Sequence, residues 1–377
     1  MSAAATEPAV SASGTGGPGV GSSGAAAKAG GGNAFNGTLQ RLAEGSDLSR
    51  AQAAAAMRQI VDGTAGEAQA AAFLMALRVK GETADEIAGL METMRQFAVP
   101  VRTAYQNALV DIVGTGGDCL GTFNISTTAA FVAAGSGVKV AKHGNRAASS
   151  RCGSADVMEA LGVLIDLMPD EVAACLDKVG IAFMLASMHH PAMGRVAGVR
   201  RALGVRTGFN FLGPLTNPAG VRRQLLGVSA VEYLDVLAGA LARVGCEHAL
   251  LVSGYGGMDE LSLTGPSTVL EVRKGTVGER YVLEPESCGL ARCQLQALAG
   301  GDPAENARVT GAILAGERGA PRDAVLLNAA AALYVAGVVP SIADGVAHAA
   351  ESIDSGRAAD VLDRMVAVTQ HLVGDRR

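Results

Sequence analysis

Residues 108–134, "ALVDIVGTGGDCLGTFNISTTAAFVAA", contain the pattern that decides the fold. The apolar run at 108–113 predicts a buried strand, and the glycine-rich turn after it lets the backbone approach a ligand closely. Asn124 or Ser126 can cap the helix that "STTAAFVAA" begins. Free N–H groups and the helix dipole then point the same way, which favours an anion site. The loop matches neither the dinucleotide-binding fingerprint nor the Walker motif.

The same alternation of short apolar runs, glycine-rich turns and helices continues along the chain. The further runs are "VKVA" at 138–141, "VLID" at 163–166, "IAFMLA" at 181–186, "QLLGVSA" at 224–230 and "HALLVSG" at 248–254. Parallel neighbours need crossover connections, so this alternation predicts an α/β domain with a mainly parallel central sheet. In such sheets ligands bind at the carboxyl ends of the strands, and we expect the site there.

A small all-helical region precedes this α/β region. "DLSRAQAAAAMRQIVDG" predicts a helix capped by Asp47 and ending at Gly63, and Thr83 with Glu86 three residues later predicts a capping box. The second helix has apolar residues at helical spacing, namely Ile87, Leu90, Met91 and Met94. The fold class expected is therefore α/β with a small all-helical domain beside a larger domain.

Domain boundaries follow from these changes in pattern. Residues 1–36 are rich in Ala, Gly and Ser and predict a disordered tail, because they offer too little apolar surface to offset the entropy of ordering. Residues 37–106 form the small helical domain, which helices from about 191–220 are expected to join. Residues 107–377 form the α/β domain.

Composition excludes several classes of function. The chain of 377 residues has a formal charge of −5, which gives no general attraction to nucleic acid or anionic membrane. It has neither a secretory signal nor a continuous apolar run long enough to span a membrane. The six cysteines are spaced neither as zinc pairs nor as a disulfide framework, so we expect reduced thiols and a cytoplasmic protein.

Two further motifs suit phosphate and metal. "KHGNRAASS" at 142–150 follows a predicted strand and carries Lys142 and Arg146; taken alone it is also compatible with a solvated basic turn. An adjacent acidic pair such as Asp259 and Glu260 is usually only surface charge. Beside phosphate-binding loops, however, two carboxylates are the ligands that Mg²⁺ requires.

These stretches resemble the anthranilate phosphoribosyltransferase family. "GTGGD", "NIST", "KHGNRAASS", "GSADVMEALG", "HHPAM", "RALGVRTGFNFLGPLTNPAG" and "DELSLTGP" occur in that family's order and spacing, and the likeness covers about residues 37–370. The resemblance implies a homodimer, formed through the small helical domain, with each active site at the hinge between domains. It also implies transfer of the phosphoribosyl group from phosphoribosyl pyrophosphate to the amine of anthranilate, in L-tryptophan biosynthesis, with Mg²⁺ at two ions per subunit.

The resemblance also assigns the site residues. Those implied to hold phosphoribosyl pyrophosphate are Gly114, Thr115, Gly116, Gly117, Asp118, Thr122, Asn124, Ile125, Ser126, Thr127, Lys142, His143, Gly144, Asn145, Arg146, Ala147, Ala148, Ser149, Ser150 and Ser154. Those implied to contact anthranilate are Gly114, Asn145 and Arg200. The metal positions are Ser126, Asp259 and Glu260.

The chemistry limits which roles the side chains need to fill. The amine of anthranilate is already nucleophilic, so positioning should dominate and no essential general base is assigned; His143 is expected to line the anthranilate pocket. An arginine suits the carboxylate of anthranilate, and Arg195, Arg200, Arg201 and Arg206 are all candidates. Arg200 and Arg201 point about 100° apart on a helix, so they cannot share one role, and only the resemblance selects Arg200.

Departures and alternatives remain at this stage. Ser187–His189 differ from the residues usual in relatives, and we expect the outer anthranilate channel to differ with them. A pyrimidine nucleoside phosphorylase shares this architecture, but its relatives carry a different lysine-serine-glycine loop. A non-catalytic nucleic-acid-binding relative should be basic and lack the acidic pair. A paralogue with the same chemistry in secondary metabolism stays open.

Overall fold

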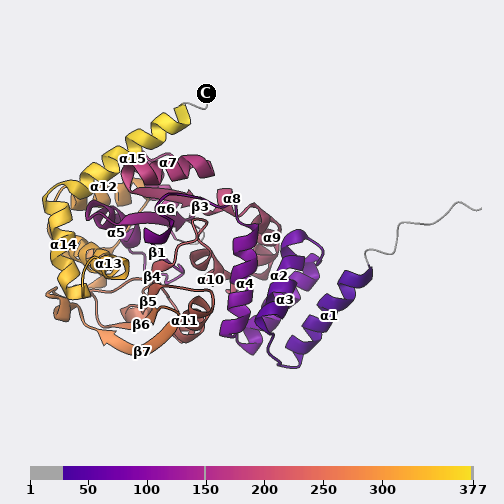
Figure 1. Ribbon diagram of the computed structural model, residues 1–377. Coiled ribbons are helices and arrows are strands. Elements are labelled where there is room, and N and C mark those ends of the chain that lie inside the picture. Colours follow the sequence, from indigo (N-terminus) through magenta and orange to yellow (C-terminus); the bar gives the residue numbers. More distant parts are fainter. Residues whose placement is uncertain (1–28, 148–149, 375–377) are drawn as a thin grey trace, which may run out of the picture.

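The computed structural model describes residues 29–147 and 150–374. In Figure 1 helices α1–α4 gather at one end of the molecule, helices α13–α15 lie at the other, and the sheet lies between them. Within the described ranges, no helix is long and apolar enough to cross a bilayer. The predicted fold class, a small helical domain beside a larger α/β domain, is confirmed.

Seven strands form one sheet in the order β3-β2-β1-β4-β5-β6-β7. Their bounds are β1 Leu109–Gly114, β2 Lys139–Gly144, β3 Ile181–Leu185, β4 Arg223–Gly227, β5 His248–Ser253, β6 Ser267–Arg273 and β7 Thr276–Leu283. Strands β1 to β5 pair in parallel, whereas β6 and β7 add antiparallel pairs at one edge. The mainly parallel sheet is as predicted.

One strand prediction is wrong. The "VLID" run at 163–166 belongs to no strand, although Val163, Ile165 and Leu167 are buried and alternate with exposed residues. The segment packs its apolar side chains into the core without joining the sheet, and its Leu164 N–H donates to the hydroxyl of Thr369 at 3.2 Å. Apolar alternation reports burial on one side, which a strand-like segment achieves without a partner strand.

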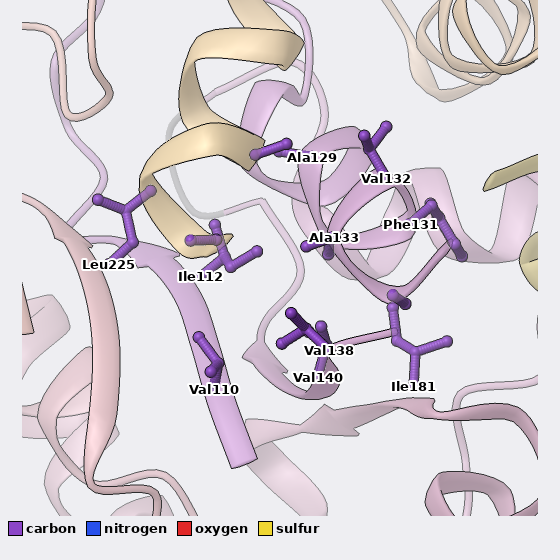
Figure 2. Close-up of a cluster of buried hydrophobic side chains, with 14 of the residues drawn as sticks. Val110, Ile112, Ala129, Phe131, Val132, Ala133, Val138, Val140, Ile181 and Leu225 are labelled. Atoms are coloured by element: carbon purple, nitrogen blue, oxygen red, sulfur yellow. The ribbon is translucent and has the colours of Figure 1, made fainter. Parts of the chain in front are cut away.

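The larger core lies between the sheet and the helices on one face. These helices are α5 Ile125–Gly135, α6 Ser154–Ala160, α7 Pro169–Val179, α12 Pro303–Leu314, α13 Ala320–Ala336, α14 Ile342–Asp354 and α15 Arg357–Gly374. Figure 2 shows Ala129 and Ala133 on the side of α5 toward Ile112 of β1, whereas Phe131 and Val132 of the same helix point away from that strand. Helix α5 is apolar almost all round because α13, α14 and α15 also pack on it. This packing fixes the N-terminus of α5 at the end of β1.

Helices α1 Ala29–Ala43, α2 Arg50–Asp62, α3 Glu67–Lys80 and α4 Ala84–Phe97 contribute to a second apolar core, and α9 Gly194–Leu203 and α10 Phe209–Leu215 pack on them. The short helix α8 Ala186–His189 instead lies against β3. The second core continues onto the second face of the sheet, where α11 Leu234–Arg243 also packs. Leu225 and Leu226 of β4 point into different cores, as the period of two in a strand requires. The second core is therefore common to the helical region and to one face of the sheet.

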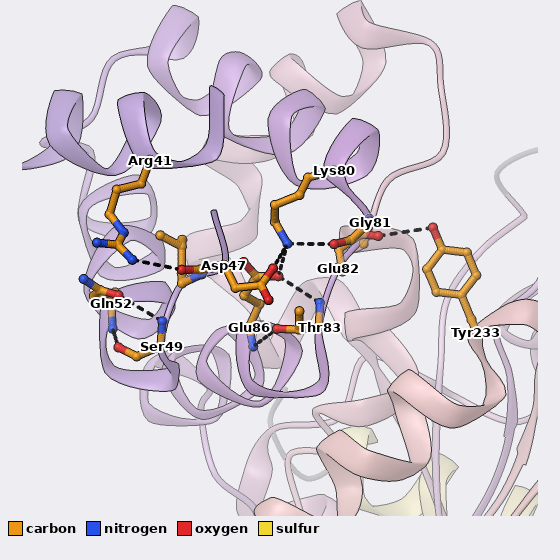
Figure 3. Close-up of polar contacts among 12 residues, drawn as sticks. Arg41, Asp47, Ser49, Gln52, Lys80, Gly81, Glu82, Thr83, Glu86 and Tyr233 are labelled. Carbon is orange, nitrogen blue, oxygen red and sulfur yellow. Dashed lines mark hydrogen bonds and ion pairs between the residues drawn. The ribbon is translucent and has the colours of Figure 1, made fainter. Parts of the chain in front are cut away.

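The ends of the small-domain helices are fixed by polar contacts, shown in Figure 3. The predicted capping box of Thr83 and Glu86 is confirmed. The predicted cap at Asp47 is wrong: Ser49 caps α2, because Asp47 is instead an ion-pair partner of Lys80 at 2.7 Å. Lys80 also pairs with Glu86 at 3.0 Å.

The predicted disordered tail lies largely outside the described residues, but its last part is helical. Helix α1 begins at Ala29, before the boundary predicted at 37. Phe35 is buried, and its ring centroid lies 5.9 Å from that of Phe73 in α3. This packing outweighs the poor helix propensity of the neighbouring glycines.

Candidate active site

The candidate site lies where the strand order reverses. Strand β1 pairs with β2 on one side and with β4 on the other, and the connection from β3 to β4 returns across β1 and β2. In an open α/β sheet such a reversal leaves a crevice at the carboxyl ends of the strands. The "GTGGD" and "KHGNRAASS" loops both begin there, at Gly114 and Gly144, as the sequence predicts.

Glycine is required in the first loop for two different reasons, a backbone conformation at some positions and a lack of space at another. Gly116 and Gly117 have φ values of +68° and +76°, which other residues adopt only with strain. Gly114 instead makes room, because a Cβ at this position would lie 2.2 Å from Oδ2 of Asp259. A Cβ on Gly227 of β4 would lie 1.6 Å from the backbone oxygen of Asp259. The acidic segment is thus packed directly over the ends of β1 and β4.

The acidic pair is half-buried at the phosphate loops. Asp259 accepts a hydrogen bond from the N–H of Gly116 at 2.6 Å, and Glu260 accepts one from the N–H of Ser126 at 3.1 Å. Burial raises the pKa of both carboxyls; the charge of Asp118 adds to this for Asp259, and that of Asp259 does so for Glu260. Neighbouring carboxylates that are partly removed from water need positive charge to remain ionised.

Lys142 supplies part of the positive charge that these carboxylates need, from a buried position beside them. Its side chain is 1% exposed, and Nζ donates to the carbonyl of Ile112 at 2.6 Å and to Oγ of Ser126 at 3.4 Å. Burial lowers the pKa of Lys142, while the charges of Asp111, Glu260 and Asp259 act in the opposite direction. Lys142 therefore lies under the predicted metal residues and is not a surface residue of the loop.

The second loop is held by its own hydrogen bonds. Arg146 is ion-paired with Glu159 and Asp156, so its charge is partly neutralised within the chain. The hydroxyl of Ser154 accepts from the N–H of Asn145 and donates to its carbonyl, each at 3.2 Å. Ala148 and Ser149 lie outside the described residues.

The remaining predicted phosphate-site residues fall into two groups. Thr115, Gly117, Asp118, Ala147 and Ser150 are exposed or half-buried along the two loops. Ile125 and Thr127 are buried in the first turn of α5, and Thr122 forms a β-bridge with Ala299. Asn124 is at the N-cap position of α5, but its side chain accepts from Asn306 at 2.9 Å instead of capping the helix.

A cavity of about 450 Å³ opens beside these loops and reaches into the small domain. Its lining includes all four residues predicted for anthranilate: Gly114, His143, Asn145 and Arg200. Arg200 is half-buried and burial lowers its pKa; no hydrogen-bond or ion-pair partner is found for its guanidinium in the part of the chain that the structure describes. Arg201 is exposed and does not line the cavity.

Ser187, Met188 and His189, which differ from the residues usual in relatives, do not all lie at the cavity. Ser187 lines the cavity, whereas Met188 and His189 do not. His189 is buried, with Nδ1 3.1 Å from the carbonyl oxygen of Val99. The expected difference in the outer channel is therefore limited, in its lining, to Ser187.

His143 is held neutral at the floor of the cavity. Burial, with a contribution from His190, lowers the pKa of His143 to about 3, and burial likewise lowers the pKa of His190 to about 4. Nδ1 of His143 lies 3.1 Å from the carbonyl oxygen of Gly213, so this nitrogen carries the proton and Nε2 is left as an acceptor. Nε2 is buried and has no hydrogen-bond partner within residues 29–147 and 150–374. A neutral imidazole of this kind can accept a hydrogen bond from a ligand.

Arg206, one of the four arginines considered for the carboxylate of anthranilate, makes a contact that the sequence did not predict. Arg206, from the segment between α9 and α10, donates through Nη2 to the carbonyl of Gly116 at 2.8 Å and through Nη1 to that of Gly117 at 2.9 Å. Ser229, after β4, donates to the same Gly116 oxygen at 3.0 Å. Arg206 thus ties the small domain to the glycine loop, a contact between distant segments that no local pattern reveals.

The comparisons with known proteins agree with this geometry. A model described as "Glycosyl transferase family, helical bundle domain" matches residues 37–98, and one described as "Glycosyl transferase family, a/b domain" matches residues 106–359. An anthranilate phosphoribosyltransferase of Anaeromyxobacter dehalogenans (strain 2CP-C) is 56% identical over 331 residues, which are 88% of this chain and 97% of that protein.

Solved structures give the same result. The anthranilate phosphoribosyltransferase of Thermus thermophilus is 47% identical with a TM-score of 0.84, over 88% of this chain and 99% of that one. The Saccharomyces cerevisiae enzyme, in complex with phosphoribosyl pyrophosphate and Mg, is 30% identical with a TM-score of 0.82, over 90% and 98% of the two chains. The yeast enzyme has also been solved in complex with 4-fluoroanthranilate.

Proposed function

This chain belongs to the anthranilate phosphoribosyltransferase family, and from that premise we propose how its own residues hold the two substrates and the metal. The enzyme transfers the 5-phosphoribosyl group from phosphoribosyl pyrophosphate to the amine of anthranilate. The products are N-(5-phosphoribosyl)anthranilate and pyrophosphate, and the reaction belongs to L-tryptophan biosynthesis. The same comparisons favour this reaction over that of a pyrimidine nucleoside phosphorylase.

Mg²⁺ is the cofactor, and the donor set fits it. Asp259, Glu260 and the hydroxyl of Ser126 are hard oxygen donors. Among the described residues, no group of three or more His, Cys, Asp or Glu side chains is arranged to hold a metal by itself. A site completed by water and substrate phosphate accounts for this, and the negative charge of Asp118 beside Asp259 supports two ions per subunit. When bound, the metal stabilises the negative charge that develops on the departing pyrophosphate.

The phosphates of phosphoribosyl pyrophosphate are assigned to the two loops at the ends of β1 and β2. The N-terminus of α5 faces this crevice and contributes the positive end of its dipole. Arg206 holds the carbonyls of Gly116 and Gly117, which fixes the loop for the incoming phosphates. Preformed N–H groups and Lys142 then stabilise the leaving group without reorganising during the reaction.

Anthranilate is assigned to the 450 Å³ cavity. Arg200, which faces the cavity with no protein partner among the described residues, pairs with the carboxylate. The neutral imidazole of His143 lines this cavity and positions the aromatic amine by packing; it takes no proton from the substrate in the bond-forming step. Asn145 lies on the loop shared by both substrates.

The observation that carries this assignment is that one crevice joins the two halves of the reaction. Gly114 lines the anthranilate cavity and at the same time lies against Asp259 of the metal site. The direct test is loss of anthranilate fluorescence when phosphoribosyl pyrophosphate and Mg²⁺ are added to the purified protein. Loss that requires all three components is expected; no loss under those conditions would contradict the assigned activity.

We also propose a cytoplasmic homodimer that associates through the small helical domain. Helix α3 exposes an apolar side chain, Val79, at 80% of its full accessible surface, and a partner subunit would cover it. All six cysteines are free, which suits a reducing compartment. Light scattering on the wild type and on Val79→Glu tests the dimer: the substitution should yield monomer, and an unchanged dimer would exclude this face.

A further inference from the structure

A second cavity, of about 400 Å³, lies at the opposite edge of the sheet from the substrate site. Its lining includes Pro100 and Val101, which precede β1, and Pro218 and Gly220, which precede β4. Because β1 and β4 are parallel, their amino ends meet at this edge, while both substrates are assigned to the carboxyl ends. The cavity therefore belongs to neither substrate.

The cavity lies between the two segments that connect the helical region to the sheet. Residues 98–108 connect α4 to β1, and residues 216–222 connect α10 to β4. The two connections are bonded to each other, since the N–H of Val101 donates to the carbonyl of Pro218 at 3.1 Å and the side-chain amide of Gln106 donates to that of Ala219. A ligand in this cavity would contact both connections.

The charges in the lining are all of one sign. Arg95 of α4 and Arg102 of the first connection line the cavity, and no Asp or Glu does. The nearby carboxylate of Glu92 is engaged by Arg50, whose Nε donates to it at 2.8 Å. Like charges that face one cavity repel each other unless an anion lies between them.

Arg95 also has an unsatisfied donor. Its Nη2 donates to the carbonyl of Leu215 at 2.9 Å, but its Nε is buried and finds no acceptor among the residues that the structure describes. A buried donor with no acceptor costs stability, and burial lowers the pKa of this guanidinium. Arg102 is exposed, and its guanidinium has no hydrogen-bond or ion-pair partner within the residues the structure describes.

The two other polar side chains of the lining, Gln106 and Asn217, are already engaged within the chain; the amide of Gln106 donates to the carbonyl of Ala219. Asn217 donates to Oδ2 of Asp111 and to the carbonyl of Ala141, both at 2.8 Å, and accepts from the N–H of Ala219 at 2.9 Å. Recognition of a polar ligand therefore falls to the two arginines, while Pro100, Val101 and Pro218 offer apolar surface. This is a site for a small molecule with an anionic head.

We propose that this cavity binds a small oxyanion, the carboxylate or phosphate group of a metabolite, between Arg95 and Arg102. The anion pairs with the guanidinium groups of Arg95 and Arg102, which both line the cavity, and its body packs on the prolines of the two connections. The site is separate from the phosphate loops of the substrate site.

Location is tested first, by soaking crystals of the full chain in selenate and recording anomalous scattering. A peak between Arg95 and Arg102 is expected, whether or not the phosphate loops also hold one. Selenate found at the phosphate loops alone would overturn the proposal.

Affinity is tested by calorimetric titration of inorganic phosphate and, separately, of malonate into the wild type and into Arg102→Gln. The variant removes the exposed half of the site, so it should fold normally, and it should weaken the tighter-binding probe at this site by roughly tenfold or more. Arg308→Gln, which changes an exposed arginine of α12, is the matched control and should titrate like the wild type. Tighter malonate binding identifies a carboxylate ligand and tighter phosphate binding a phosphorylated one. If Arg102→Gln binds both probes as the wild type does, the site does not exist.

Discussion

Oδ2 of Asp259 accepts a hydrogen bond from the backbone N–H of Gly116 at 2.6 Å, so the acidic segment and the first phosphate loop are joined before either substrate is present. Gly114 makes this contact possible, because any side chain there would strike Asp259. The positions assigned to metal and phosphate are therefore parts of one packed unit. A change to either carboxylate should alter the kinetics with respect to phosphoribosyl pyrophosphate and leave the KM for anthranilate unchanged.

The first prediction concerns that unit. Asp259→Asn combined with Glu260→Gln keeps the size of both side chains and removes the charge that holds Mg²⁺. Turnover should fall by on the order of 10²–10³ or more, the usual scale when stabilisation of a developing charge is lost. Steady-state kinetics over a Mg²⁺ titration measure this.

The fold should survive the same double change. Neighbouring carboxylates that are partly removed from water are costly without metal, so the melting temperature of the metal-free variant should equal or exceed that of the wild type. Near-normal turnover in a folded variant would rule out these residues as the metal site. Unfolding of the variant would instead mean that the pair is structural.

The second prediction separates Arg200 from Arg201. Arg200→Ala removes the unpaired guanidinium in the cavity and should raise the KM for anthranilate roughly thirtyfold, the value of a charge-assisted contact of about 2 kcal/mol. Arg201→Ala, one residue along and exposed, is the matched control and should change little. Kinetics with each substrate varied in turn decide the matter; a larger effect from Arg201 would reverse the assignment.

Much of the fold could be predicted because local pattern and tertiary burial agree. The Thr83 box, for example, is decided within four residues of sequence. The "VLID" segment and Asp47 failed because their outcome depends on distant partners: Thr369 for the first, Lys80 for the second. A residue suited to a cap or a strand takes another role when a stronger partner lies near it in space.

The candidate site was likewise predictable where local sequence decides and unpredictable where distant contacts decide. Residue types at the strand ends indicated phosphate and metal, and the cavity brings together the residues predicted for anthranilate. The sequence could not show that Lys142 is buried at the site or that Arg146 is paired with Glu159. Both outcomes depend on which groups fold against these side chains, the carbonyl of Ile112 for Lys142 and the carboxylate of Glu159 for Arg146. Arg206 received no role for the same reason.

The third prediction tests Arg206. Arg206→Ala removes both hydrogen bonds to the glycine loop, and losing them should raise the KM for phosphoribosyl pyrophosphate by roughly thirtyfold, since the two together are worth about 2 kcal/mol. Amide hydrogen exchange at residues 115–121 should accelerate in the same variant. An effect confined to anthranilate would show that Arg206 serves the other substrate.

The fourth prediction concerns the packing of the small domain. A Cβ on Gly89 of α4 would lie 2.3 Å from the carbonyl oxygen of Arg50 in α2, so Gly89→Ala should wedge these helices apart and cost about 1–3 kcal/mol. Gly311→Ala in α12, where nothing lies within 4 Å of the new methyl group, is the control and should stabilise by up to about 1 kcal/mol. Urea unfolding of both variants gives the comparison; equal stability would mean that α2 and α4 are loosely packed.

The last prediction uses the pKa of His143, which burial lowers from 6.5 to about 3. Below pH 6.5 the unfolded chain binds a proton at this residue that the folded chain does not, so the free energy of unfolding should fall as the pH falls from 6.5 toward 3. The slope from one such group is at most about 1.4 kcal/mol per pH unit. Carboxylates titrate in part of the same range, so only a difference between two proteins isolates the histidine.

His143→Asn supplies that difference, because an amide keeps the donor that faces the carbonyl of Gly213 and cannot titrate. Between about pH 7 and pH 5 the wild type should lose on the order of 1–2 kcal/mol more stability than the variant, whatever their difference at the higher pH. Urea unfolding at several pH values measures both curves. Parallel curves would mean that His143 takes up its proton as readily in the folded protein as in the unfolded chain, and a neutral imidazole could then no longer be assigned to the floor of the anthranilate cavity.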